Sequence, residues 1–155
     1  MYRIPRYQVQ LVREGSVSVK NKRIEAPETA IKILQSFLSG TDRENFVVML
    51  LDTKNVVIGI NVVSVGSLTS TAAHPREVFK PAILSNANSI IIAHNHPSGD
   101  PSPSEEDTKV TNRLVEGGKL LGIEVLDHII IGDGTERSFS YQSSGFMGKA
   151  LGETK

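Results

Sequence analysis

Cysteine is absent from the 155-residue chain, so the protein can form no disulfide and use no thiolate as a nucleophile. Any metal ion would have to be held by histidine and carboxylate side chains. Net charge is also absent, because 17 basic side chains balance 17 acidic ones, which argues against a generally basic surface for nucleic acid. The longest apolar run, Phe46 to Leu51, has six residues, far fewer than the roughly 20 that span a bilayer. We therefore expect no membrane contact.

The composition is that of one folded domain. Apolar residues make up 39% of the chain and 13 glycines add to them, so the chain can bury a sizeable core. The first six residues, Met-Tyr-Arg-Ile-Pro-Arg, lack the apolar stretch of a secretion signal. The default expectation is a cytoplasmic protein.

The zero net charge hides an uneven distribution. Residues 1–23 carry a balance of +5 and the remaining 132 residues carry −5. The cations are Arg3, Arg6, Arg13, Lys20, Lys22 and Arg23, against Glu14. Alternation in residues 7–12 and the triplet 17–19 predict a pair of strands with a solvated basic face. The alternative is a basic arm that contacts an acidic partner, or weakly contacts nucleic acid through residues 1–23.

Hydrophobic periodicity predicts helices interleaved with strands after residue 26. Helices are expected over residues 27–38, 75–86 and 104–121. Strands are expected over 45–52, 56–65, 89–94, 123–131 and 137–141, with the first two joined as a hairpin. This order predicts an α/β or α+β layered domain, a mixed β-sheet flanked by helices. The predicted division is a basic strand segment (1–26), a domain (27–141) and a C-terminal tail (142–155), frayed after residue 145.

The stretch from His94 to Asp107 holds the residues best suited to chemistry. His94 and His96 stand two positions apart at the end of a predicted strand, so their side chains point to the same side of the sheet. Asp107 lies in the first turn of the next predicted helix and can supply a carboxylate. Two histidines and a carboxylate with an open fourth position are typical of a hydrolytic zinc site. Taken alone, Ser104 and Asp107 instead predict a capping box, which needs no metal.

The spacing His94-x-His96-x7-Ser104-x2-Asp107 resembles the signature of the JAMM metalloproteases, the JAB/MPN domain family, without departure. The longer string His-Asn-His-Pro-Ser-Gly-Asp-Pro is similar to the RadC branch of that family. Residues 75–79 (Pro-Arg-Glu-Val-Phe) and 126–128 (Leu-Asp-His) support this, and the resemblance covers about residues 27–141. RadC-type proteins usually carry an N-terminal helix-hairpin-helix region, so this chain resembles the short, single-domain version.

The resemblance implies a mixed sheet with flanking helices, in the cytidine-deaminase-like MPN/JAB architecture. It also implies one Zn²⁺ per chain, held by His94, His96 and Asp107, with water as the fourth ligand. Ser104 would help to position that water or stabilise an oxyanion. A glutamate upstream would act as general base. Glu44, directly before the first core strand, is the favoured candidate, and Glu77, at the start of a helix, is its rival.

The implied function is that of a zinc-dependent metallopeptidase or isopeptidase-like hydrolase, which cleaves amide bonds in an unknown protein or peptide substrate. The alternative is a DNA repair or mobile-element-associated accessory protein that acts on or near DNA without proteolysis. A pseudoenzyme is a third reading, which the complete ligand set disfavours. His128 is expected to be buried or supporting, with Asp127 as its partner. Asn95 and Asp100 are expected to be supporting groups or loop caps.

Overall fold

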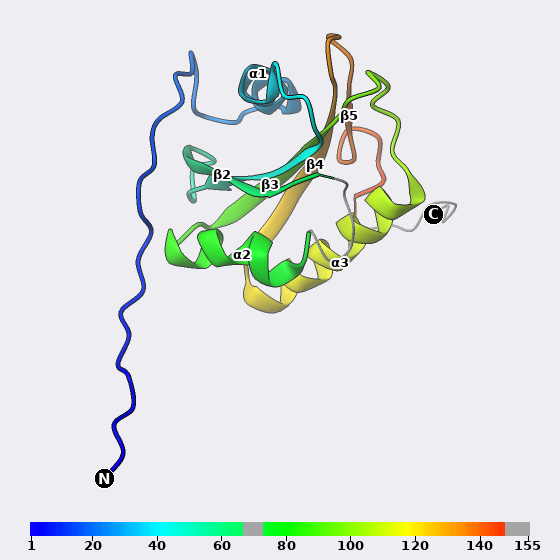
Figure 1. Cartoon of the computed structure of the whole chain (residues 1–155). Helices are drawn as coiled ribbons and strands as arrows, with labels where there is room; N and C mark the ends of the chain where they lie inside the picture. The colour runs from blue at the N-terminus through cyan, green and yellow to red at the C-terminus, as the bar shows by residue number, and fades with distance from the viewer. Residues whose placement is uncertain (67–72, 148–155) are drawn as a thin grey trace.

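The computed structural model describes residues 1–66 and 73–147, and its centre is a mixed five-stranded sheet in the order β2-β1-β3-β4-β5 (Figure 1). The strands are β1 (Asn45–Leu51), β2 (Val57–Val65), β3 (Ser89–His96), β4 (Glu124–Gly132) and β5 (Ser138–Ser140). Strands β3 and β4 are parallel, and the other neighbouring pairs are antiparallel. Helix α1 (Pro27–Leu38) covers one face, and α2 (Pro75–Leu84) and α3 (Glu105–Leu121) cover the other (Figure 1). The predicted fold class is confirmed.

Two apolar layers hold the helices against the sheet. Strand β1 serves both, because it is apolar at nearly every position and lies between two neighbours. Its side chains alternate: Phe46, Val48 and Leu50 pack in the layer with α2 and α3, whereas Val47, Met49 and Leu51 pack in the layer with α1. The central strands are therefore fixed from both sides, and the ends of these strands form a rigid platform.

Helix α3 is the crossover between the parallel strands β3 and β4. Ser104 is its N-cap, and Gly122 ends it in the left-handed conformation, with φ 71°. Because the loop from β3 leads directly into α3, the first turn of the helix lies beside the carboxyl end of β3. That arrangement brings Asp107 close to the two histidines.

The predicted strands at residues 7–12 and 17–19 are not formed. Residues 1–19 have no regular secondary structure, and residues 1–23 are all exposed. Pairing begins only at an isolated bridge between Arg23 and Val56, on the outer side of the sheet. The prediction of a strand pair here was wrong, because a short two-stranded ribbon is unstable unless it packs against other elements.

The predicted C-terminal tail (142–155) falls partly outside the described residues, which end at 147. Residues 142–147 form turns after β5. Within the described part of the chain, no helix is both long and apolar enough to span a bilayer.

Candidate metal centre

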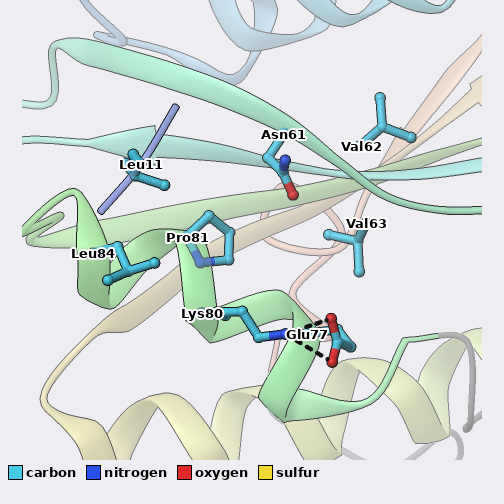
Figure 2. Close-up of a pocket in the computed structure, with 8 residues that line it drawn as sticks. All are labelled: Leu11, Asn61, Val62, Val63, Glu77, Lys80, Pro81 and Leu84. Carbon is cyan, nitrogen blue, oxygen red and sulfur yellow. Dashed lines mark hydrogen bonds and ion pairs between the residues drawn. The ribbon is translucent and has the colours of Figure 1, made fainter. Parts of the chain in front are cut away.

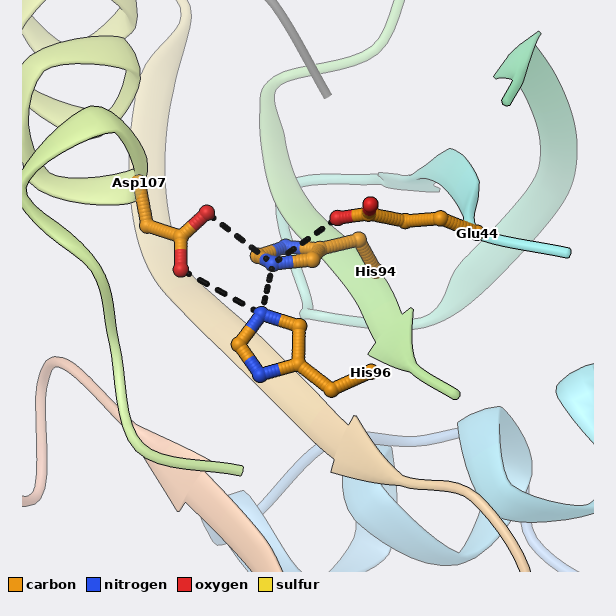
Figure 3. Close-up of side chains that lie close together, drawn as sticks. All are labelled: Glu44, His94, His96 and Asp107. Carbon is orange, nitrogen blue, oxygen red and sulfur yellow. Dashed lines mark hydrogen bonds and ion pairs between the residues drawn. The ribbon is translucent and has the colours of Figure 1, made fainter. Parts of the chain in front are cut away.

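Four side chains converge at the carboxyl end of β3: Glu44, His94, His96 and Asp107 (Figure 3). One potential ligand atom from each lies within 4.8 Å of the others. His94 and Asp107 are buried, and the other two are half-buried. The structure therefore brings together all three predicted metal ligands and the favoured glutamate.

The distances between the ligand atoms suit a tetrahedral ion. The two histidine Nε2 atoms are 3.0 Å apart, and the Asp107 carboxylate oxygens lie 3.2 Å from His94 Nε2 and 3.3 Å from His96 Nε2. Ligands at about 2.0–2.1 Å from a tetrahedral zinc ion are separated by about 3.3 Å. The Glu44 carboxylate is farther away, at 3.7 Å from His94 Nε2. Three side chains thus match the inner ligands, and Glu44 stands beside them.

A backbone carbonyl fixes the protonation of His96. Its Nδ1 lies 2.8 Å from the carbonyl oxygen of Asp100. A carbonyl can only accept a hydrogen bond, so Nδ1 of His96 carries the hydrogen and donates it. In a neutral imidazole the other nitrogen then has a lone pair. The Nε2 atom of His96 presents that lone pair to the cluster.

A buried relay fixes His94 in the same way. The carbonyl of Asp107 accepts the hydroxyl hydrogen of Thr111 (2.7 Å), so the Thr111 oxygen accepts from His128 Nδ1 at 2.5 Å. Burial lowers the pKa of His128 well below its usual value and keeps the ring neutral. Its Nε2 therefore accepts from Nδ1–H of His94, 2.8 Å away. His94 is left with a lone pair on Nε2, which faces His96 and Asp107.

Two lone pairs and a carboxylate therefore face one another at contact distance. Burial acts to raise the pKa of Asp107, but when the facing Nε2 atoms carry a proton, hydrogen bonds from His94 and His96 outweigh burial and hold that pKa far below its usual value. The hydrogen bond that the protonated His96 ring donates to Asp107 in turn raises the pKa of His96, against the opposing effect of burial. The donor set thus requires a positive charge at its centre, which an added proton or a metal cation can supply. A metal and a proton compete for the same nitrogen.

The capping box of α3 orients Asp107. The Ser104 hydroxyl accepts from the Asp107 backbone N–H at 3.1 Å, and the Asp107 carboxylate accepts from the Ser104 N–H at 2.8 Å. The capping and metal readings of these residues are therefore compatible, because one carboxylate serves both. Ser104 itself is exposed, and its hydroxyl hydrogen is not used in the capping box.

Asn95 positions the segment that carries Glu44. Its side chain lies on the opposite side of β3 from the two histidines, because it stands between them in the strand. The amide oxygen accepts from the Asn45 N–H at 2.7 Å, and the amide nitrogen donates to the Arg43 carbonyl at 2.8 Å and to Asp133 at 2.7 Å. Both neighbours of Glu44 are thus held by one buried side chain.

Glu77 lies elsewhere. It stands in the first turn of α2 and forms an ion pair with Lys80 at 3.1 Å, in a groove between α2 and β2 (Figure 2). It is absent from the cluster of potential ligands that the described residues form. This position makes Glu77 a suitable comparison for Glu44.

The loop after β3 packs closely on the end of β4. A Cβ atom at Gly132 would lie 2.2 Å from the carbonyl oxygen of Gly99, far inside contact distance. Only glycine therefore permits this approach. The backbone N–H of Asp133 also donates to the His96 carbonyl at 3.1 Å. These contacts fix the loop that holds the Asp100 carbonyl against His96.

The relay through His128 was not predicted. His128 is buried as expected, but its partners are His94 and Thr111. Asp127, the expected partner, instead accepts from the Ser140 hydroxyl at 2.6 Å and the Gln142 N–H at 3.0 Å. Thr111 stands four residues after Asp107, on the same face of α3, and this spacing was the available signal.

We expect Thr111→Val to lower the zinc affinity of the chain about tenfold, the lower end of the range for supporting residues of metal ligands. The substitution conserves shape but removes the hydroxyl that fixes the protonation of His128 and, through it, of His94. Zinc titration against a competing chelator measures the effect. Thr108→Val is the matched control, because Thr108 bonds Tyr141 and the Ser104 carbonyl rather than the relay. Equal affinities in the two variants would contradict the relay.

Comparison with known proteins places this site in a family. The model of the RadC-like JAB domain matches residues 24–146. A UPF0758 protein of Moorella thermoacetica is 60% identical over 122 residues, which cover 79% of this chain and 53% of that protein. A UPF0758 protein of Methanosarcina mazei is 48% identical over 134 residues, covering 86% of this chain and 58% of that protein.

A third relative, a UPF0758 protein of Caldanaerobacter subterraneus, is 50% identical over 131 residues, which cover 84% of this chain and 55% of that protein. The chain thus spans little more than half the length of these relatives. The matched residues include the whole cluster from Glu44 to Asp107. The chain belongs to the RadC-like JAB domain family.

Proposed function

We propose that the protein is a zinc-dependent hydrolase of amide or isopeptide bonds. The observation that carries the proposal is the convergence of two imidazole lone pairs and the Asp107 carboxylate, with a second carboxylate, Glu44, beside them. Three protein ligands with an adjacent acid–base group are the arrangement of hydrolytic zinc sites, whereas structural zinc sites have four closed ligands. The family supports a hydrolase, and the choice of zinc and of amide bonds is our proposal.

His94, His96 and Asp107 would hold the ion. A zinc ion bound there would supply Lewis-acid chemistry, which polarises a carbonyl and lowers the pKa of water towards about 7. Glu44 would act as the general base, accepting a proton from water and passing it to the leaving amine. Its side chain is 22% exposed, so water and substrate can reach it.

Ser104 is the proposed donor to the developing negative charge on the substrate oxygen. It is exposed, it is joined to Asp107 through the capping box, and its hydroxyl hydrogen is not used in that box. One such donor can contribute roughly 3–4 kcal/mol to the transition state. Its capping role, by contrast, uses only the oxygen.

We expect Asn95→Ala to slow hydrolysis at least about tenfold with little change in zinc affinity. The amide fixes the backbone on both sides of Glu44, and misplacement by about 1 Å can cost roughly a hundredfold. Measuring both kcat and the dissociation constant for zinc in the same variant separates the effect on hydrolysis from the effect on zinc binding. A parallel loss of both would instead show that Asn95 supports the whole end of the sheet.

The function is tested by metal-dependent cleavage of two probe sets, quenched fluorescent peptides and peptides joined through a lysine isopeptide bond. We expect cleavage of at least one probe set by the zinc-loaded chain. Removal of zinc with a chelator should abolish it, and added zinc should restore it. Cleavage that persists without zinc would contradict the proposal, as would zinc-loaded protein inert towards both sets.

A further inference from the structure

We infer that the N-terminal arm (residues 1–23) joins two copies of this chain, by adding to the outer edge of β2 in the second copy. The arm and β2 contain none of the residues of the metal centre, so the inference does not depend on the proposed hydrolase. The arm, the edge of β2 and the groove beside it carry the argument.

The arm has the alternating pattern of a β-strand but does not form a strand in its own domain. Tyr7, Val9 and Leu11 alternate with Gln8 and Gln10, so the apolar side chains share one face when the segment is extended. In the structure Tyr7 is 83% exposed and Val9 78% exposed. Burying such a face is what stabilises a strand. The N-terminal end of the arm runs away from the domain, so its own domain does not bury it (Figure 1).

The outer edge of β2 is suited to accept a strand. The strand has nine residues, Val-Ile-Gly-Ile-Asn-Val-Val-Ser-Val, without a charge or a proline. Edge strands usually carry such residues, because they prevent pairing with another chain. Ile58 and Val62 are also 46% and 42% exposed. An uncharged, half-exposed edge of this length is a template for a further strand.

The chain's own arm pairs with the start of β2 but does not continue along the strand. The Val57 N–H donates to the Lys22 carbonyl at 2.7 Å, and the Ile24 N–H donates to the Asn55 carbonyl at 2.8 Å. Arg23 and Val56 form the only isolated bridge among the described residues. From Val57 onward, no strand of the described part of the chain lies outside β2. Within the described residues, the backbone from residue 58 to 65 forms no hydrogen bond with the arm, so these edge groups can still pair with another chain.

Leu11 marks where the arm leaves its own domain. Its side chain lies in the groove between β2 and α2, beside Asn61, Pro81 and Leu84 (Figure 2). Leu11 is 48% exposed, well below Val9. With Leu11 seated, residues 1–10 reach roughly 33 Å when extended. That length is sufficient to lie along a strand of a neighbouring molecule.

Charge favours a second copy as the occupant. The arm carries +5 and the rest of the chain −5, so each arm is attracted to the body of the other molecule. The exchange can be reciprocal, with both arms and both β2 edges related by a twofold axis. Such a closed arrangement uses every arm and every edge once. Intrachain folding would use them equally, but within the described residues the arm forms a backbone hydrogen bond with β2 only at Lys22.

The first test is the oligomeric state of the full chain by analytical ultracentrifugation from about 1 to 100 μM, the range of moderate protein association. We expect a dimer that dissociates on dilution. Val9→Lys should raise the dissociation constant of the dimer at least about tenfold, because it places a charge on the face of the arm that is buried in the dimer. Gln10→Lys is the matched control, since it adds the same charge on the other face and should leave association nearly unchanged.

The second test uses the absence of native cysteine. Val9→Cys and Val62→Cys are made in separate chains, mixed and oxidised, so that a heterodimeric disulfide requires an arm of one molecule to reach β2 of another. We expect this crosslink in the mixture in excess over either variant alone.

Three results would overturn the inference. A chain that stays monomeric at 100 μM would do so, as would a dimer whose dissociation constant responds equally to Val9→Lys and Gln10→Lys. The third is a monomer whose arm instead binds a DNA duplex, with an affinity that falls steeply with salt. That result would assign the arm to nucleic acid.

Discussion

Glu44→Gln should lose most hydrolysis while keeping zinc and the native fold. Glutamine has the size and polarity of glutamate but cannot accept a proton from water at neutral pH. General-base removal costs roughly 10²–10⁴-fold in rate. The three inner ligands are untouched, because the Glu44 carboxylate lies 3.7 Å from His94 Nε2, farther than the Asp107 carboxylate at 3.2 Å. Turnover of a cleaved probe and zinc content are measured on the same preparation.

Glu77→Gln is the control for that experiment. Glu77 also precedes an apolar segment, but it pairs with Lys80 in the groove beside β2. Its loss should cost only a few tenths of a kcal/mol, through the ion pair and the helix dipole, and should leave turnover unchanged. An inactive Glu77→Gln beside an active Glu44→Gln would contradict the assignment of the base.

Substitution of the inner ligands should instead remove the metal. His94→Ala, His96→Ala and Asp107→Asn should each weaken zinc binding by roughly a hundredfold or more, since a zinc free energy of about 10–16 kcal/mol is shared among three or four ligands. Turnover should fall with the zinc content. Zinc titration at constant pH is essential, because Asp107 raises the pKa of His96 and the proton competes with the metal.

The fold should survive these substitutions. Two apolar layers enclose the sheet independently of the cluster, so circular dichroism and a cooperative thermal transition are expected in every variant. His74→Ala is a suitable control for nonspecific histidine effects, since His74 caps α2 away from the cluster. Unchanged zinc affinity in all three ligand variants would contradict the site.

The sequence predicted the helices and the sheet because local patterns decided them. Pro27 and Pro75 begin helices, Gly122 ends one, and continuous apolar runs form the central strands. The strand prediction failed at residues 7–12. The alternation there indicates a strand, but it does not identify the segment that would pair with it. A strand needs a partner, and partners lie outside the local sequence.

The metal ligands were equally predictable, because the spacing of His94, His96 and Asp107 determines that they meet once β3 and α3 form. The supporting contacts were not predictable. His128 reaches His94 across two parallel strands, and Asn95 reaches Arg43 and Asn45 from 50 or more residues away. Only the tertiary register of the sheet brings such groups together.

The most direct test of the metal centre is a crystal of the chain grown with one equivalent of zinc and measured on both sides of the zinc absorption edge. We predict a single strong anomalous peak bounded by Nε2 of His94, Nε2 of His96 and the Asp107 carboxylate, at about 2.0–2.1 Å from each ligand atom. Two results would contradict this assignment. One is a crystal without an anomalous peak although the protein binds one equivalent of zinc in solution. The other is a peak at other residues while this cluster is empty.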